Sequence, residues 1–175
     1  MQIRVPGGSL KKFLLLLAAA LTLVCIYGTA AFNLSESGAV RFLDELEKLS
    51  LQGNSDAYCA RLHADMTVSI RDHTSPGMPR DFDGGKSQFC EFITTAAKGV
   101  DLIGPESHAT RTDFSVTRSW LHPWTAQVSY HETRTTRLTR INVTLNTQGD
   151  DQWTLVQTFA GVKARRLVSE SRRAD

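Results

Sequence analysis

The feature that most constrains this chain is an uninterrupted apolar run near its N-terminus. The run extends from Phe13 to Ile26, Lys11 and Lys12 directly precede it, and no charged residue follows until Glu36. A basic flank is retained on the cytoplasmic side of a membrane, so the chain after the run is delivered to the far side. The sequence therefore predicts an exported protein, periplasmic or secreted.

The same segment leaves two fates open. Thr29, Ala30 and Ala31 are small residues of the kind that precede a cleavage site, which predicts residues 1–31 as a signal peptide. Residues 13–32 would also form a helix of about 30 Å, which is long enough for a membrane anchor. If cleavage does not occur, the protein stays attached to the inner membrane through this segment alone.

The chain beyond residue 31 has the composition of one globular domain. The whole sequence has 175 residues and a formal net charge of +2, but the part after residue 31 has 17 basic and 18 acidic side chains. Because this part of the chain is nearly neutral, its charge gives no reason to expect a nucleic-acid partner. We divide it into a domain over residues 32–164 and a basic, polar tail over residues 165–175.

Export changes the interpretation of two cysteines. Cys59 and Cys90 would enter an oxidising compartment, where paired thiols form disulfides. A bond between them closes a loop of about 31 residues and stabilises the fold by roughly 3.5 kcal/mol on the chain-entropy model. The alternative is two separate buried thiols. No CxxC or HExxH motif occurs and the histidines are not at ligand spacing, so we expect no metal and no cofactor.

Helical periodicity dominates the first half of the domain. An amphipathic helix, which Ser35 or Ser37 can cap and Gly53 can end, is predicted by an apolar face at three- and four-residue steps. A short second helix carries Tyr58, and a third is predicted over residues 86–98, with an apolar stripe of its own. The face of the first helix consists of Ala39, Phe42, Leu43, Leu46 and Leu49.

Alternating residues predict strands elsewhere. One strand is expected over residues 66–71, followed by a Gly- and Pro-rich loop over residues 73–85. The chain after residue 105 consists of strands, with residues 126–131 in one of them and a turn at residues 147–151. Helices come first and an antiparallel meander comes last. This segregation predicts an α+β fold, with three N-terminal helices packed on a curved, mostly antiparallel sheet.

Three short motifs accompany this order of elements. Residues 54–58 (NSDAY) precede the LHADMTV segment at residues 62–68, and DGGKSQF at residues 83–89 opens the third helix. Together they resemble the nuclear transport factor 2-like superfamily, which includes ketosteroid isomerase and the polyketide cyclases, over roughly residues 36–162. The resemblance implies a cone-shaped, cystatin-like α+β fold. The helices and the concave side of its sheet enclose a pocket, and the convex side can form a homodimer.

The resemblance does not bring the isomerase mechanism with it. In that branch a carboxylate base follows the Thr-Val of the first strand, and the oxyanion hole uses a first-helix Tyr and a protonated Asp on a later strand. Alignment on Thr67 and Val68 places Ile70 at the position of the base, the first helix has no Tyr, and Arg140 or Asn142 stands near the later carboxylate. We therefore expect an interior without the acid that proton abstraction needs.

Two hypotheses about function follow. In the first, an exported non-catalytic module binds a small apolar ligand or an envelope protein. The phase of the helices and strands and the family layout give its pocket wall as Tyr58, Met66, Val68, Phe89, Val128 and Tyr130. In the second, a small exported lyase, isomerase or hydrolase uses Asp72 and His73 at a loop mouth as an acid/base pair. A desolvated carboxylate or imidazole beside a second polar group in the pocket would favour the second hypothesis.

Two tryptophans flank a predicted hairpin turn. Trp120 and Trp124 lie on either side of Leu121, His122 and Pro123. Large aromatic side chains at a hairpin tip either fold back onto the body or meet a partner, because leaving them in water is costly. We expect these two to fold back.

Overall fold

The structure is a computed structural model that describes residues 7–74, 80–103 and 105–174. The described part of the chain begins with three helices, α1 (Gly7–Asn33), α2 (Glu36–Leu51) and α3 (Ser55–Ala60), and a fourth, α4 (Lys86–Ile103), follows the second strand. The strands are β1 (Leu62–His73), β2 (Arg80–Gly85), β3 (Pro105–Ser119), β4 (His122–Leu138), β5 (Val143–Thr158) and β6 (Gly161–Arg173).

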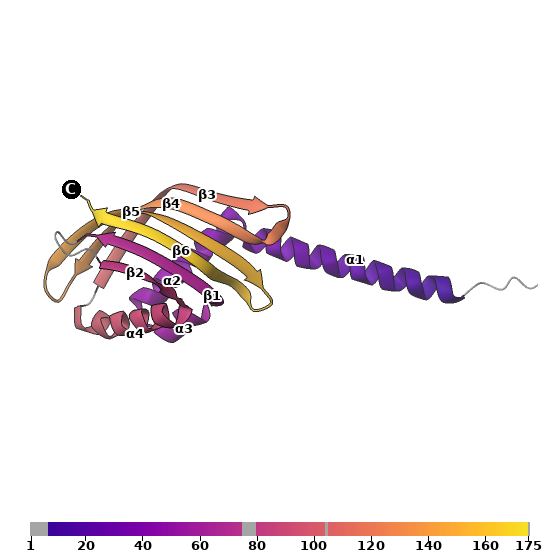
Figure 1. Cartoon of the computed structure of the whole chain (residues 1–175), viewed down its shortest axis with the longest axis horizontal. Helices are drawn as coiled ribbons and strands as arrows, with labels where there is room; N and C mark the ends of the chain where they lie inside the picture. The colour runs from indigo at the N-terminus through magenta and orange to yellow at the C-terminus, as the bar shows by residue number, and fades with distance from the viewer. Residues whose placement is uncertain (1–6, 75–79, 104, 175) are drawn as a thin grey trace, which may run out of the picture.

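These strands form one bent sheet in the order β2-β1-β6-β5-β4-β3. Every neighbouring pair is antiparallel except β1 with β6, which are parallel. The shorter helices α2, α3 and α4 lie along the concave side of the sheet, whereas α1 extends away from the domain (Figure 1). The predicted α+β fold, with three helices packed on a curved and mostly antiparallel sheet, is confirmed.

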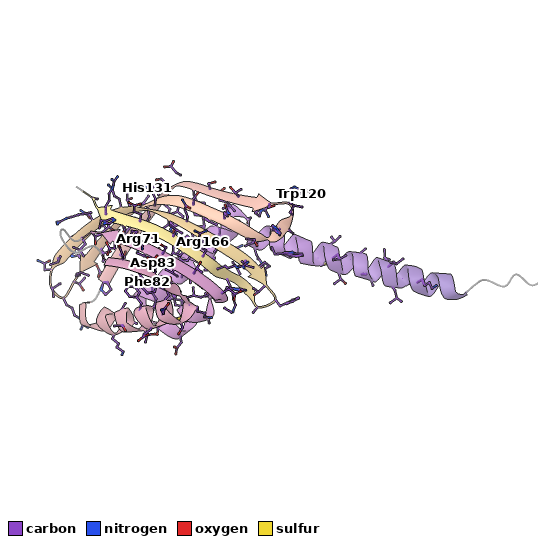
Figure 2. All side chains as sticks on the ribbon, in the orientation of Figure 1. Arg71, Phe82, Asp83, Trp120, His131 and Arg166 are labelled. Carbon is purple, nitrogen blue, oxygen red and sulfur yellow. A yellow bond between two sulfur atoms is a disulfide. The ribbon has the colours of Figure 1, made fainter. Side chains whose placement is uncertain are left out.

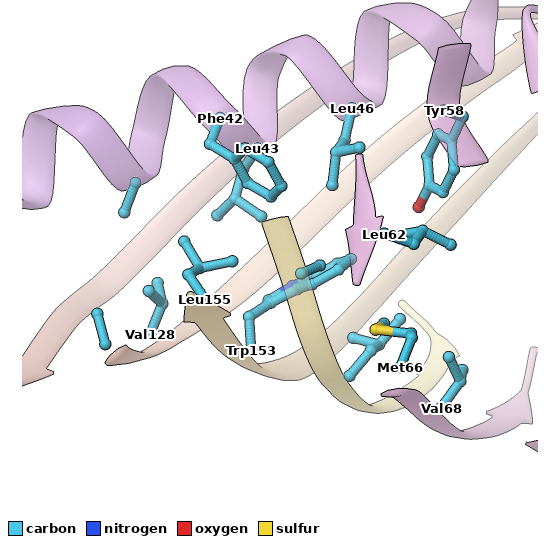
Figure 3. Close-up of a cluster of buried hydrophobic side chains, with 14 of the residues drawn as sticks. Phe42, Leu43, Leu46, Tyr58, Leu62, Met66, Val68, Val128, Trp153 and Leu155 are labelled. Atoms are coloured by element: carbon cyan, nitrogen blue, oxygen red, sulfur yellow. The ribbon is translucent and has the colours of Figure 1, made fainter. Parts of the chain in front are cut away.

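The core lies between α2 and the concave face of the central strands. Ser35 caps α2 by accepting a hydrogen bond from the amide of Gly38 at 3.2 Å, which fixes the start of the helix. Leu34, at the corner between α1 and α2, is fully buried. Figure 3 shows the α2 side chains above those of the sheet. The cluster includes Phe42, Leu43, Leu46, Leu62, Met66, Val128, Trp153 and Leu155.

Helix α1 leaves the domain with its apolar surface exposed. Leu15 and Leu16 each expose 71% of their surface, and Val24 exposes 68%. No helix among the described residues has both the length and the apolar character that crossing a membrane requires. The interpretation of residues 1–31 as a signal peptide or anchor stays a prediction.

The predicted loop over residues 73–85 is wrong for its last part. Residues 80–85 form the edge strand β2, which pairs with β1 from Asp72 opposite Arg80 to Thr67 opposite Gly85. Two long-range contacts hold this strand: Arg71 donates to Asp83 at 2.7 Å, and the Phe82 and Phe89 rings lie 5.6 Å apart. Neither contact is visible in the local composition, which indicated only turns. Residues 75–79 lie outside the described part of the chain.

The predicted turn at residues 147–151 is also wrong. These residues lie inside β5, and the chain instead turns just before it, where Asn142 adopts a left-handed conformation with φ of 52°. Gly149 is therefore not a turn residue. A Cβ at this position would collide with the backbone carbonyl of Glu170 on β6, so glycine is needed because two strands approach closely.

Two boundaries also differ from the prediction. Residues 165–173 are not a tail, because they continue β6, which lies between β1 and β5 in the sheet. Helix α4 continues past Gly99 to Ile103. In both places the tertiary neighbours override the local signals, which were basic composition in the first case and a glycine in the second.

The predicted disulfide is present. Cys59 on α3 and Cys90 on α4 are bonded, with their Cα atoms 5.8 Å apart. The bond joins a six-residue helix to the longer helix beside it, near the aromatic pair Tyr58 and Phe89. Cys25 on α1 is exposed and is not part of this bond.

Candidate functional site

A cavity of about 220 Å³ lies between the C-terminal half of α2 and the concave face of the sheet. Its wall is apolar on the helix side and polar on the sheet side. We call it the Asp151 pocket, after the carboxyl group on its floor. The lining residues are Leu43, Leu46, Glu47, Ser50, Leu51, Tyr58, Arg111, Tyr130, Glu132, Arg134, Asp151 and Trp153.

A bulge in β3 determines which side chains of that strand reach the pocket. Pairing with β4 shifts between Thr112 and Ser115, and Asp113 in the bulge has a φ of 54°. The extra residue changes the alternation of the strand, so Arg111 and Phe114 both reach Tyr130 on β4. The guanidinium of Arg111 lies 5.5 Å from the centre of the Tyr130 ring, and Phe114 stacks on the same ring at 5.6 Å.

The floor of the pocket is a hydrogen-bonded set from three neighbouring strands. Asp151 on β5 stands directly opposite Tyr130 on β4 and Ser169 on β6. The hydroxyl groups of both neighbours donate to its carboxyl group. The Tyr130 hydroxyl in turn accepts from the indole Nε1 of Trp153 at 3.1 Å. The phenol is therefore held in place by a donor on one side and an acceptor on the other.

Burial changes the proton affinity of this set. It raises the pKa of the Asp151 carboxyl above the ordinary value of 3.8, and the hydrogen bonds from Ser169 and Tyr130 offset this only in part. Burial, followed by the charge of Asp151, also raises the pKa values of Tyr58 and Tyr130. Both phenols stay protonated at neutral pH. The Tyr58 hydroxyl can therefore donate to a bound molecule, whereas the Tyr130 hydroxyl donates to Asp151 and keeps one lone pair that can accept a hydrogen bond from a bound molecule.

An ion-pair network borders the polar side of the pocket and ties the sheet to α2. Arg111 contacts Glu47 at 2.8 Å and Glu132 at 3.3 Å, and it also pairs with Asp44. Arg134 contacts Glu47 at 2.9 Å and Glu132 at 2.8 Å. The two glutamates are shared by the two arginines, so removing one cation leaves half-buried carboxylates with fewer partners.

The structure brings together only part of the predicted pocket wall. Tyr58 and Tyr130 line the Asp151 pocket, whereas Met66, Val68, Phe89 and Val128 are buried in the hydrophobic core and do not line it. The four core side chains pack against helix or sheet neighbours, as the phase of their elements dictates.

Asp72 and His73 do not form a pair. They are successive residues of β1, so their side chains point to opposite faces of the sheet. Asp72 accepts from the amide of Thr74 at 2.9 Å and from the hydroxyl of Ser171 at 3.4 Å, and it does not line the Asp151 pocket. His73 is exposed. Acid/base work by these two residues on one ligand is therefore excluded by the strand geometry.

The expectation of an interior without an acid is wrong. Asp151, Glu132 and the two arginines are functional candidates that the sequence analysis missed. Two of them, Glu132 and Arg134, could have been predicted from the sequence. They continue, at two-residue steps, the strand face that starts with Val128 and Tyr130. Asp151 was hidden by its assignment to a turn.

The raised pKa of Asp151 predicts a specific dependence of stability on pH. The folded state holds this proton more tightly than the unfolded state, so the contribution of the group is most favourable below pH 4 and is lost as pH rises through the folded-state pKa. Urea unfolding of the wild type and Asp151→Asn should show a stability difference, wild type minus variant, that falls as pH rises from about 4 towards neutrality. Asp113→Asn, the same substitution at an exposed position outside the pocket, is the control. A difference that grows with pH would contradict the assignment.

The sequence matches no protein-family profile and no curated protein sequence that we compared with it. Solved structures do match the fold. A nuclear transport factor 2-like protein with a cystatin-like fold from Novosphingobium aromaticivorans gives a TM-score of 0.54 at 17% identity, over 91% of this chain and 88% of that chain. The β subunit of benzoate 1,2-dioxygenase from Burkholderia mallei gives 0.58 at 7% identity, over 79% and 89%.

A third structure has a name that suggests a dehydratase. It comes from Streptomyces avermitilis and is assigned to the same nuclear transport factor 2-like family, with a TM-score of 0.53 at 13% identity, over 81% of this chain and 99% of that chain. At these identities the similarity concerns the fold, and the proteins named differ in what they do. The described part of this chain therefore has the nuclear transport factor 2-like fold that its sequence predicts.

Proposed function

We propose that the domain is an exported, non-catalytic binding module that holds a small molecule in the Asp151 pocket. The observation that carries the proposal is the pocket itself, which places a fixed phenol and a carboxyl group beneath an apolar wall. Such a cavity, with a few converging polar groups, is the usual form of a small-molecule site. The position of the isomerase base is occupied by Ile70, which cannot take up a proton.

The lining indicates the chemistry of the ligand. Leu43, Leu46 and Leu51 cover one side, so the ligand has an apolar body. Among the lining residues on the other side, Arg111 and Arg134 are offset by Glu47 and Glu132, so these four carry no net charge, and burial favours the neutral form of Asp151 by raising its pKa. A cavity of about 220 Å³ is smaller than most sites for drug-sized ligands. These features fit a small, neutral molecule that has an apolar body and a hydroxyl or carbonyl group.

Binding can be followed through Trp153, which lines the pocket. The chain has three tryptophans, so Trp120→Phe with Trp124→Phe leaves Trp153 as the sole indole. In this background phenol and benzyl alcohol should change the emission of Trp153 at lower concentration than benzoate does. Tyr130→Phe should weaken binding of the alcohols by roughly tenfold, because one hydrogen bond is lost.

His73→Gln is the matched control, because His73 is exposed outside the pocket, and it should leave binding unchanged. Two results would reject the proposal: no response of Trp153 to any of the three compounds, or a loss of affinity in the His73 variant equal to that in the Tyr130 variant.

One observation favours a second function. Asp151 is a desolvated carboxyl within hydrogen-bonding reach of Tyr130, which is the arrangement that a general base and a positioned acid require in a lyase or isomerase. The two functions separate experimentally. A binding module returns each bound probe chemically unchanged, whereas an enzyme converts it, and Asp151→Asn then stops conversion while Trp153 still reports binding.

A further inference from the structure

Two hairpin tips and the exit of α1 share one end of the domain. In Figure 1 the turn between β3 and β4 and the turn between β5 and β6 both lie on the side from which α1 extends. The side-chain Nδ2 of Asn33, the last residue of α1, donates to Oε1 of Gln157 at 3.1 Å, close to the second turn. The base of α1 is therefore fixed between the two hairpins. We call this region, formed by the two turns and the base of α1, the α1 end.

Large apolar side chains are exposed at both turns. Trp120 exposes 83% of its surface and Leu121 exposes 62%, so the expectation that Trp120 folds back onto the body is wrong. Phe159 at the second turn is fully exposed. Figure 2 shows Trp120 at the tip of the β3–β4 hairpin, on the side of the domain from which α1 extends. Single exposed apolar residues are ordinary, but a Trp, a Leu and a Phe on adjoining tips of one end mark an interaction surface.

The charges around these tips have one sign. No Asp or Glu occurs between Asp113 and Glu132, nor between Asp151 and Glu170. The basic side chains in these two stretches are Arg118, Lys163, Arg165 and Arg166. The acidic groups on neighbouring elements are Glu36, in the first turn of α2, and Asp65 on β1, which lies 3.7 Å from His63. The halves of the two hairpins that lead to the tips therefore carry basic side chains and no carboxylates, although the domain is close to neutral.

We propose that the α1 end rests on the surface of an anionic lipid bilayer, with Trp120, Leu121 and Phe159 in the headgroup region. Trp at the interface and basic residues near acidic headgroups are the two features that hold proteins at this depth. The α1 helix leaves from the same end with its leucines exposed, so helix and hairpins reach the same bilayer together. The exposed helix and the hairpin tips are two separate membrane-binding signals, and two signals attach a protein to a bilayer more stably than one does.

This placement leaves the Asp151 pocket in solution. The pocket is lined by Ser50 and Leu51 at the C-terminal end of α2, whereas the N-terminal end of α2 adjoins the base of α1. The lipid surface is thus at the opposite end of the helix from the pocket. The inference does not depend on what the pocket binds.

The test measures the depth of Trp120 in the full chain on vesicles. Vesicles of dioleoylphosphatidylcholine and dioleoylphosphatidylglycerol, 7:3, are prepared with and without brominated acyl chains, which quench tryptophan on contact. Brominated lipid should quench the wild type, and Trp120→Phe should lose at least half of that quenching. Trp124→Phe, a substitution on the same hairpin, is the matched control and should retain most of it. With phosphatidylcholine alone, the quenching should fall at least twofold.

Three results would overturn the proposal. Equal quenching in the wild type and Trp120→Phe would place Trp120 outside the lipid. Equal quenching with and without the anionic lipid would remove the role of the basic hairpins. Protection of Trp120 from both brominated lipid and aqueous iodide, with a doubled mass after crosslinking, would show that a second copy covers this end. Because Trp120 is exposed, the variant should keep the wild-type circular dichroism spectrum, which separates these results from misfolding.

Discussion

Replacement of Cys59 with Ala should lower the free energy of unfolding by about 3.5 kcal/mol in the absence of reductant, which corresponds to a melting temperature lower by about 10 °C. The Cys59–Cys90 bond closes a loop with a sequence separation of 31 residues. Without the bond, the unfolded chain gains the freedom of that loop, while the folded chain keeps nearly all of its contacts. Thermal unfolding of the wild type and the variant, each with and without dithiothreitol, provides the measurement.

Reductant makes this test specific to the bond. In dithiothreitol the wild type should fall to the stability of Cys59→Ala, and the variant should not change. Cys25→Ala is the control, because Cys25 is exposed and lies outside the disulfide, and its melting temperature should equal that of the wild type. If Cys59→Ala loses as much stability relative to the wild type in reductant as without it, the loss comes from packing, and the disulfide has no role.

Leu155→Ala should cost about 3 kcal/mol, because the side chain is fully buried between the sheet and α2. The loss combines the transfer of the removed methyl groups to water with the cavity that the neighbours cannot fill. Figure 3 shows Leu155 surrounded by core side chains from both layers, including Leu43 and Val128. The measurement is urea unfolding followed by circular dichroism.

The same strand offers the control. Leu145→Ala makes the same chemical change at a position that exposes 44% of its surface, and it should cost about 0.5 kcal/mol or less. The difference between the two variants tests the position of the core directly. The two leucines lie on the same face of β5, so similar losses would mean that the core also covers the start of the strand, where Leu145 lies.

The fold could be predicted where a local pattern and the tertiary structure agree. The apolar face of α2 repeats at helical steps, and the alternation of Ala126, Val128 and Tyr130 fixes the inward face of β4, so the layers follow from the residues. The pattern fails where a residue serves a distant neighbour. Gly149 looks like a turn residue, but it is needed because β6 passes close to it. That one misreading also placed Asp151 in a turn and hid the floor of the pocket.

The site was predictable only in part, for a related reason. Tyr58 and Tyr130 could be selected from the phase of their elements. Arg111, however, reaches the pocket because a bulge at Asp113 changes the alternation of β3, and nothing in the local sequence announces that bulge. The charge network is likewise a product of pairing: Glu47 and Arg134 are far apart in sequence and meet only when α2 lies on the sheet.

The position of β6 has a consequence for how the chain is made. The last strand is inserted between β1 and β5, and it is the element that joins the first part of the sheet to the hairpins. Until β6 (Gly161–Arg173) has been synthesised, β1 and β2 form one piece of the sheet, and β3, β4 and β5 form another. Each piece then has an edge strand whose backbone groups are unpaired. The six-stranded sheet can therefore close only after nearly the whole chain has been synthesised, because its central connection is made by the last strand.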